Sequence, residues 1–146
     1  MREIKFRGKD ASDNWVYGSL ISGTTGKGVE VSFIAPGLPV GTSNFEFWET
    51  RMIRVKPETV GQFTGWSRKG KFELYGGDVI GFDDWAFSER ERKKMRHHVG
   101  VIEWSGDYGK WMIKCKDGYF EGNDVADPQL LGNIYDNPEL LEGNEL

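Results

Sequence analysis

Apolar and polar positions alternate along most of the chain, and glycines interrupt the alternation at short intervals. In 3-EIKFRG-8, Ile4 and Phe6 fall on one side and Lys5 and Arg7 on the other, which is typical of a half-buried strand. Similar patterns predict strands at 14–22, 29–35, 45–55, 60–66, 72–75, 78–82, 98–105, 110–115 and 119–125. Short strands with turns every ~8–12 residues indicate a mainly β protein, built as a small SH3-like barrel or a sandwich with short helical turns.

Proline positions suggest how the strands are grouped. Pro57 ends the fourth strand pattern because proline has no N–H to give to a ladder. We therefore expect an N-terminal β lobe at 1–56, a C-terminal barrel-like lobe at 57–127, and a C-terminal packing segment and tail at 128–146. The three parts form one continuous domain, and Asn137-Pro138 begins a short helical turn over 138–142.

Composition narrows the cellular setting of the protein. The N-terminus has no apolar signal region, and no apolar run approaches the ~18 residues of a membrane span. The single cysteine, Cys115, allows no internal disulfide, and it lies in the apolar run 111–115, which predicts a buried bystander. These features predict a cytoplasmic protein that needs no membrane and no cofactor.

Charge is distributed unevenly along the chain. The segment 89–98 holds five Lys/Arg and two Glu, hence +3, whereas 117–146 holds eight acids and no Lys or Arg, hence −8. Such opposite charges attract each other within a chain or between copies, so we expect a homo-oligomer. The net charge of −4 disfavours a generic nucleic-acid binder, because nucleic-acid affinity comes largely from neutralising phosphates.

The segment 83–98 carries the candidate binding residues. Two aromatic side chains stand among basic ones, and the set is Trp85, Phe87, Arg90, Arg92, Lys93, Lys94 and Arg96. Aromatic residues beside Arg and Lys stack on bases or fill a partner's pocket, which suggests nucleic acid or a protein as the ligand. The plainer interpretation is that the aromatics anchor a long loop onto the barrel.

Candidate catalytic and metal residues do not combine into a recognisable set. His97 and His98 are adjacent, so on a strand they point to opposite faces, and we interpret them as a solvated basic edge. Asp83-Asp84 with Glu103 or Asp107 could form a carboxylate pair, but the bland interpretation is turn acids. We therefore predict no metal site, no catalytic residues and no enzyme activity.

The stretch 74-LYGGDVI-80 raises the question of a ligand loop or an architectural corner. Gly77 can adopt positive φ at low steric cost, and the Asp78 side chain can accept hydrogen bonds from nearby backbone N–H groups. We interpret the stretch as a corner at the entry of a strand.

Four segments, 4-IKFRG-8, 57-PETVGQFTG-65, 74-LYGGDVI-80 and 132-GNIYDNPELL-141, together resemble the YopX family, in order and over almost the whole chain. This family comprises small, largely uncharacterised proteins encoded by phages, prophages and other bacterial mobile elements. The resemblance implies a mainly β, barrel-like fold with oligomer formation. The motif positions it singles out as structural are Gly77, Asp78, Gly132, Asn133, Tyr135 and Pro138.

These observations lead to one functional expectation and one alternative. We expect a non-enzymatic accessory protein of a phage or mobile element in the bacterial cytoplasm, acting through self-association and contacts with host or phage proteins. The alternative is a nucleic-acid-binding β-barrel that uses the 85–96 aromatic and basic loop.

Overall fold

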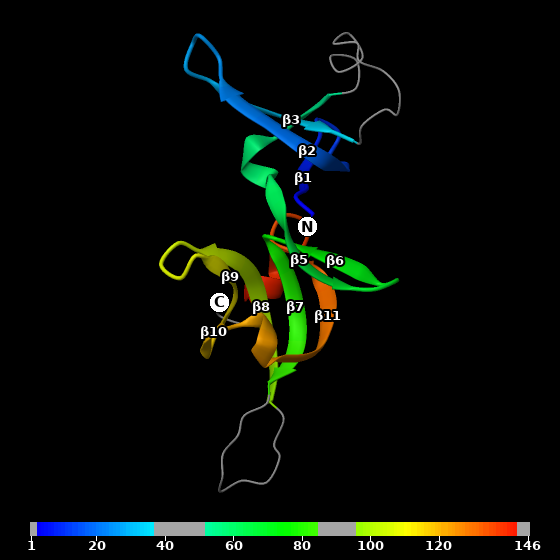
Figure 1. The fold of residues 1–146 in the computed structure, drawn as a ribbon, viewed down its shortest axis with the longest axis vertical. Helices are drawn as coiled ribbons and strands as arrows, with labels where there is room; N and C mark the ends of the chain where they lie inside the picture. The colour runs from blue at the N-terminus through cyan, green and yellow to red at the C-terminus, as the bar shows by residue number, and fades with distance from the viewer. Residues whose placement is uncertain (1–2, 37–51, 85–95, 143–146) are drawn as a thin grey trace, which may run out of the picture. The chain divides into compact units, whose positions relative to one another are not determined.

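A computed structural model describes residues 3–36, 52–84 and 96–142 of the 146-residue chain. This part is mainly β, with antiparallel sheets and short helical segments (Figure 1). The strands are β1 (Phe6–Lys9), β2 (Trp15–Thr24), β3 (Glu30–Ala35), β4 (Ile53–Val55), β5 (Gly61–Arg68), β6 (Phe72–Tyr75), β7 (Asp78–Asp84), β8 (Arg96–Ser105), β9 (Lys110–Cys115), β10 (Gly118–Phe120) and β11 (Val125–Asn133). The helical segments are η1 (Pro57–Thr59), η2 (Gly122–Asp124) and α2 (Glu139–Glu142), the last matching the turn predicted at 138–142.

Two sheets hold these strands. One has the order β4-β3-β2-β1-β5-β6 and the other β10-β9-β8-β7-β11. Figure 1 shows the second order directly, with β9, β8, β7 and β11 side by side. Among the described strands no closed barrel is found, so the barrel predicted from the sequence is not confirmed.

The chain divides into two compact units, Met1–Trp66 (unit 1) and Ser67–Leu146 (unit 2). The boundary falls inside β5, whereas the sequence pattern places it at Pro57. Strand pairing explains the later position, because Phe6 of β1 lies opposite Gln62 of β5 and Arg7 opposite Gly61. The residues that follow Pro57 are thereby tied to unit 1.

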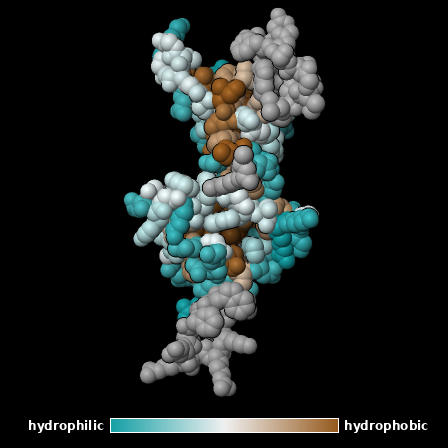
Figure 2. Space-filling view, viewed as in Figure 1, coloured by the Kyte–Doolittle hydropathy of each residue, from teal (hydrophilic) through white to brown (hydrophobic). Residues whose placement is uncertain are grey.

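Unit 1 is built around a small apolar cluster. Val16, Ile34 and Val55 are buried, and Phe6, Leu20 and Val60 pack against them. On the face shown in Figure 2, apolar residues gather over unit 1, where Tyr17, Ile21, Val29 and Ile53 are among the exposed large apolar side chains. The sheet of unit 1 therefore leaves part of its apolar surface accessible.

The faces of β1 differ from those predicted. Ile4, expected inside, is 68% exposed, whereas Arg7, expected outside, is only 5% exposed. The reason is Trp15, whose indole ring lies 4.5 Å from the Arg7 guanidinium carbon and 5.3 Å from Lys9 Nζ. Long cationic side chains can bury their stems along an aromatic ring, so alternation alone does not tell which face is covered.

Unit 2 has a core of its own. Val79, Ile80, Phe82, Ile102 and Ile113 are almost completely buried. Every residue of β7 except Asp83 is buried, although the strand contains two further aspartates and a glycine. A strand buried on both faces must satisfy its polar groups internally, and this requirement shapes the site described below.

The end of unit 2 differs from the sequence prediction. The pattern at 119–125 yields only the end of β10, followed by η2, and the strand β11 was not predicted at all. Asp127, with a positive φ of 45°, and Pro128 interrupt its alternation, and its register against β7 shifts twice. No helix within the described ranges has the length and apolarity that a bilayer crossing needs.

Candidate functional site

Most of the predicted binding loop lies outside the described residues. This applies to Trp85, Phe87, Arg90, Arg92, Lys93 and Lys94. Arg96 is described: it is exposed, it begins β8, and it lies opposite Asp84 of β7. The site therefore has to be sought around the ends of β7 and β8 and on the neighbouring hairpins.

The Gly-Gly-Asp stretch joins β6 to β7. Gly77 has a φ of 90°, and its N–H donates to the carbonyl of Ile102 over 2.8 Å. The Gly77 carbonyl accepts from the N–H of Ile134 at 2.9 Å. Asp78 is 1% exposed, and its Oδ2 accepts from the N–H of Tyr75 at 2.7 Å. Three hydrogen bonds therefore hold this turn in place.

The motif at the end of β11 forms a second such turn. Asn133 Oδ1 accepts from the N–H groups of Tyr135 (3.0 Å) and Asp136 (2.9 Å), while Asn133 Nδ2 donates to Asp136 Oδ2 at 2.9 Å. The Asn137 N–H donates to the Asn133 carbonyl at 2.9 Å. A Cβ built on Gly132 would collide with the Asn137 side chain, so this backbone approach requires glycine.

Tyr135 and Pro138 complete the contacts of the motif. The Tyr135 ring lies 3.4 Å from a Cβ built on Gly77, so the two turns pack against each other. Pro138 precedes α2, and its carbonyl accepts from the N–H of Leu141 at 3.1 Å. Apart from the side-chain hydrogen bond between Asn133 and Asp136, these contacts fix the backbone of the two turns.

A buried histidine with two carboxylates lies at the other end of unit 2. His98 Nε2 is 2.9 Å from Asp84 Oδ2, and His98 Nδ1 is 3.4 Å from Asp117 Oδ2. The His98 side chain is 5% exposed, that of Asp84 13% and that of Asp117 68%. The imidazole also contacts the rings of Phe82 (centroids 5.4 Å apart) and Phe120 (4.6 Å). We call Asp84, His98 and Asp117 the histidine clasp.

The solvated basic edge predicted for the two histidines is therefore wrong for His98. It holds for His97, which is exposed and pairs with Asp83 at 3.1 Å. Asp83 and Asp84 at the end of β7 face the two histidines of β8, one pair on each face of the sheet. Asp83 and Asp84 thus have histidine partners at hydrogen-bond distance.

Metal binding gains no support from this arrangement. In residues 3–36, 52–84 and 96–142 no group of three or more His, Cys, Asp or Glu side chains is placed to hold a metal ion. Within the same ranges Asp84 Oδ1 is buried and makes no hydrogen bond. This orphan oxygen is enclosed, so a ligand could reach it only if neighbouring side chains moved.

Cys115 is buried near the clasp. Burial, and after it the charge of Asp117, raises the pKa of the thiol from 9.0 to about 12. A thiol with such a pKa holds almost no thiolate at neutral pH, and the thiolate is the nucleophile. The arrangement suits the bystander role expected from the sequence.

An exposed aromatic group stands on the β8–β9 hairpin. Trp104 lies opposite Trp111 in the ladder, and their rings meet edge to face with centroids 5.4 Å apart. Trp104 is 52% exposed, and Tyr108, in the turn between the strands, is 71% exposed. Lys110 lies over the Tyr108 ring at 5.7 Å. We call Trp104, Tyr108 and Trp111 the aromatic hairpin.

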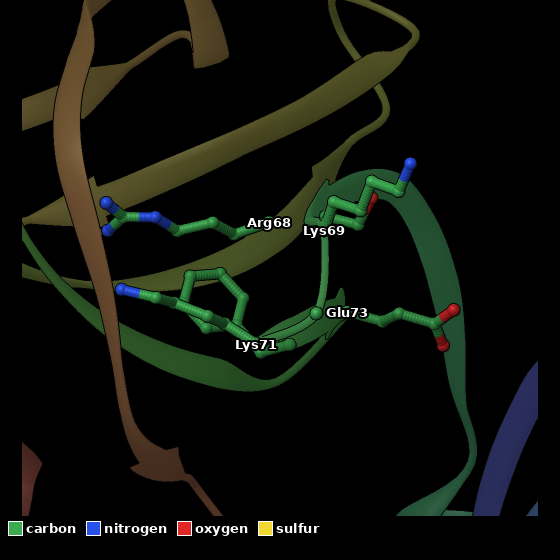
Figure 3. A pocket seen from close by; sticks show the side chains of 7 residues that line it. Arg68, Lys69, Lys71 and Glu73 are labelled. Carbon is green, nitrogen blue, oxygen red and sulfur yellow. The ribbon is translucent and has the colours of Figure 1, made fainter.

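A basic depression is formed by the β5–β6 hairpin. It encloses about 530 Å³ and is lined by Ser67 to Glu73. Figure 3 shows the side chains of Arg68 and Lys71 extending to the same side, while Lys69 and Glu73 point in other directions. The Arg68 guanidinium is held by Asp127 at 2.9 Å.

The acidic C-terminal part of the chain is partly neutralised from within. Arg68 pairs with Asp127, and Lys110 forms a close pair with Glu121. Both contacts join a cation from an earlier strand to an acid in the 117–146 segment. Two of the eight acids from which self-association was predicted are therefore already paired with cations of the same chain.

Sequence reasoning missed both the clasp and the aromatic hairpin as units. The available signal was the Asp-Asp and His-His dipeptides, which a β7–β8 hairpin places opposite each other. For the aromatic hairpin the signal was Trp104 and Trp111 flanking the turn at 106–109. No pattern in the sequence indicated which of these side chains are buried, because burial depends on strands that are distant in the sequence.

Comparison with known proteins gives one family and one similar structure. The solved structure of protein EF1440 from Enterococcus faecalis matches with a TM-score of 0.52 and 21% sequence identity, covering 97% of this chain and 99% of that chain. At this identity the likeness concerns the fold alone. No curated protein matches. The family model described as "YopX protein" matches residues 5–142, nearly the whole chain, in agreement with the motifs of the sequence, and the chain therefore belongs to the YopX family.

Proposed function

We propose that the protein is a non-enzymatic accessory protein of a phage or other mobile element, acting in the bacterial cytoplasm through protein–protein contacts. This setting is part of the proposal and is suggested by the resemblance of the sequence motifs, whereas the mode of action is argued from the surface of the molecule. The contact we propose is self-association through the aromatic hairpin.

The observation that carries this proposal is the exposure of Trp104 and Tyr108 on a paired hairpin. Trp and Tyr dominate the binding energy of protein interfaces, because they bury a large area with few rotatable bonds. Trp104 is held by its edge-to-face contact with Trp111 and by the β8–β9 ladder. An aromatic side chain that is already ordered loses little conformational entropy when a partner covers it.

A second copy of the chain is the partner that this surface suits. A two-fold contact places the same patch of each copy face to face, so the patch must complement itself. Lys110 of the hairpin lies over the Tyr108 ring and forms a close pair with Glu121, which follows β10. Opposite charges on the rim of one patch allow each lysine to face the acid of the other copy.

Size-exclusion chromatography with light scattering tests the proposal on the full chain. We expect a mass above that of the monomer, rising with protein concentration, and a return to the monomer in Trp104→Ala. Tyr119→Ala is the matched control, because Tyr119 is 55% exposed and lies on another strand, β10, opposite Lys114. A strict monomer, or equal losses of mass in the two variants, would contradict self-association through this hairpin.

The β5–β6 hairpin favours nucleic-acid binding as a second candidate function. Arg68 and Lys71 extend to the same side of an open depression, and Lys69 adds a third cation (Figure 3). Arg96 is the described member of the basic segment that the sequence suggested for the same function. Phosphate contacts of this kind give binding that weakens steeply with salt.

Fluorescence titration with single-stranded oligonucleotides at several salt concentrations tests this candidate. The double variant Lys69→Ser, Lys71→Ser should reduce the salt slope by roughly 1 for each phosphate that is no longer neutralised. Lys27→Ser, at an exposed lysine of the β2–β3 loop, is the control. Failure of the unchanged protein to bind at low salt would eliminate the candidate.

A further inference from the structure

The histidine clasp brings three separate parts of unit 2 to one imidazole. Asp84 is the last residue of β7, His98 lies near the start of β8, and Asp117 lies in the turn between β9 and β10. The β9–β10 turn is short, and β10, with three residues, is the edge strand of its sheet. The clasp is therefore placed to decide whether this edge stays attached.

The chemistry of the contacts selects one protonation state. A neutral imidazole has one N–H donor and one lone pair, whereas an imidazolium has a donor at both nitrogens. Here Asp84 Oδ2 is at hydrogen-bond distance from Nε2 (2.9 Å), and Asp117 Oδ2 is at ion-pair distance from Nδ1 (3.4 Å). Only the charged form of His98 attracts both, because the neutral form must direct a lone pair at one of the carboxylates.

We propose that the histidine clasp is a proton-operated lock, which holds the β9–β10 turn and strand β10 onto β7 and β8 while His98 is doubly protonated. When the proton leaves, the contact with Asp84 survives as an ordinary hydrogen bond from Nε2, because both groups are buried. The contact with Asp117 is released, since this carboxylate is the more distant partner and can turn to water. The edge formed by β10 then opens.

Phe120 transmits the release to the strand. Its ring is 4.6 Å from the imidazole centroid and 5.4 Å from the Phe82 ring, so β10 is attached to the core through the same cluster as the clasp. Histidine is the side chain that most readily changes charge between about pH 5 and 8, so this is the range to examine. This inference is independent of the self-association proposed above.

The other charged groups near His98 have assignable roles. From β9, Cys115 remains an uncharged thiol at these pH values because its pKa is raised to about 12. From β7 and β8, the pair Asp83–His97 lies on the opposite face and is exposed. Because it lies on the other face of the sheet from the buried ring, this pair serves as an internal control.

Hydrogen exchange of the full chain, measured by NMR between about pH 5 and pH 8, tests the lock. We expect the protection factors of the β10 amides to fall by about tenfold or more as pH rises. The ring nitrogens of His98, followed by ¹⁵N NMR, should lose a proton over the same pH range. A protection factor that does not change, or one that changes without titration of His98, would overturn the proposal.

Three variants separate the lock from a purely structural role. Asp117→Asn removes the exposed carboxylate and should abolish the pH step, leaving β10 weakly protected throughout. Asp83→Asn, the matched change on the opposite face, should keep the step. His98→Gln should also abolish the pH step. If this substitution of a buried residue prevents folding, the result for Asp117→Asn is sufficient to test the lock. A step retained in Asp117→Asn, or absent in Asp83→Asn, would rule the lock out.

Discussion

Unit 1 and unit 2 both bury charged side chains, and they accommodate them in different ways. In unit 1, Arg7 and Lys9 lie over the face of Trp15, an aromatic ring that attracts cations. In unit 2, Asp78 accepts a backbone N–H and Asp84 faces a histidine, so buried carboxylates meet hydrogen-bond donors. The difference follows from charge sign, because long cations can slide along an apolar ring whereas a short carboxylate needs a fixed donor.

The comparison shows where each unit is sensitive to substitution. Unit 1 has a small cluster of three buried apolar side chains and exposed apolar residues around it. In unit 2, buried polar groups occupy defined positions among the apolar side chains, so the geometry around them is tightly determined. The predictions below test this contrast, from the largest expected effect to the smallest.

The largest expected effect is on the rate at which the Cys115 thiol is modified. Cys115 is the single cysteine, so this rate reports on unit 2 alone. A pKa raised from 9.0 to about 12 lowers the thiolate population about a thousandfold at neutral pH. We expect iodoacetamide to modify the native protein more slowly than the protein unfolded in guanidinium, by the same factor as the decrease in thiolate population. Mass spectrometry follows the modification. Rapid modification of the native chain would show that the core of unit 2 opens readily.

Glycine substitutions compare the packing of the two units directly. A Cβ at Gly100 would clash with Ile113 and stand 2.5 Å from Cys115 Sγ and 2.9 Å from the Lys114 carbonyl oxygen, so Gly100→Ala should cost about 3 kcal/mol or more. The three atoms nearest to a Cβ at Gly8 in unit 1 belong to the Val55 side chain, the closest at 2.9 Å, so Gly8→Ala should cost about 1–3 kcal/mol.

Urea unfolding followed by circular dichroism measures both glycine variants. Gly106→Ala is the control, since a Cβ there meets nothing within 4 Å and should change the free energy of unfolding by less than about 0.5 kcal/mol. Equal losses of stability for Gly100→Ala and Gly106→Ala would contradict the tight packing of unit 2.

Buried polar groups provide the next comparison. Asp78→Ala leaves the N–H of Tyr75 without its carboxylate acceptor in the core, and this should cost about 1–3 kcal/mol. Ser32→Ala in unit 1 removes only the 3.2 Å hydrogen bond with Ser22, which is part-buried and can turn to water, so the cost should stay near ~0.5 kcal/mol. Thermal unfolding of both variants ranks them, and a larger loss of stability in Ser32→Ala would reverse the contrast.

The smallest effect concerns the exposed pair of unit 1. A hydrogen bond from Lys56, supported by its charge, holds the pKa of Asp13 below 3.8. Because the folded-state pKa is lowered, the stabilisation is present above the ordinary pKa and is lost as pH falls through the folded one. In Lys56→Met the NMR titration midpoint of Asp13 should rise towards 3.8, whereas Lys27→Met should leave it unchanged. An unchanged midpoint in Lys56→Met would show that the pair does not form in solution.

Local patterns were sufficient for most strands and turns. Period-two alternation located β2, β3, β6 and β9 within a few residues, and the Gly-Asp pair marked the corner where Gly77 has positive φ. Strand β11 escaped because Pro128 and two register shifts break its alternation. Such an irregular strand is recognised only from its pairing with β7 in the folded structure.

By itself the sequence determined that this chain forms antiparallel strands with glycine corners, and its motifs determined the family. These properties depend on neighbouring residues, since side-chain alternation and turn geometry are local. Only the tertiary structure decided that Arg7 is buried and that His98 lies between Asp84 and Asp117. Strand pairing joins residues distant in the chain, and burial depends on which surfaces meet, so neither can be calculated from spacing alone.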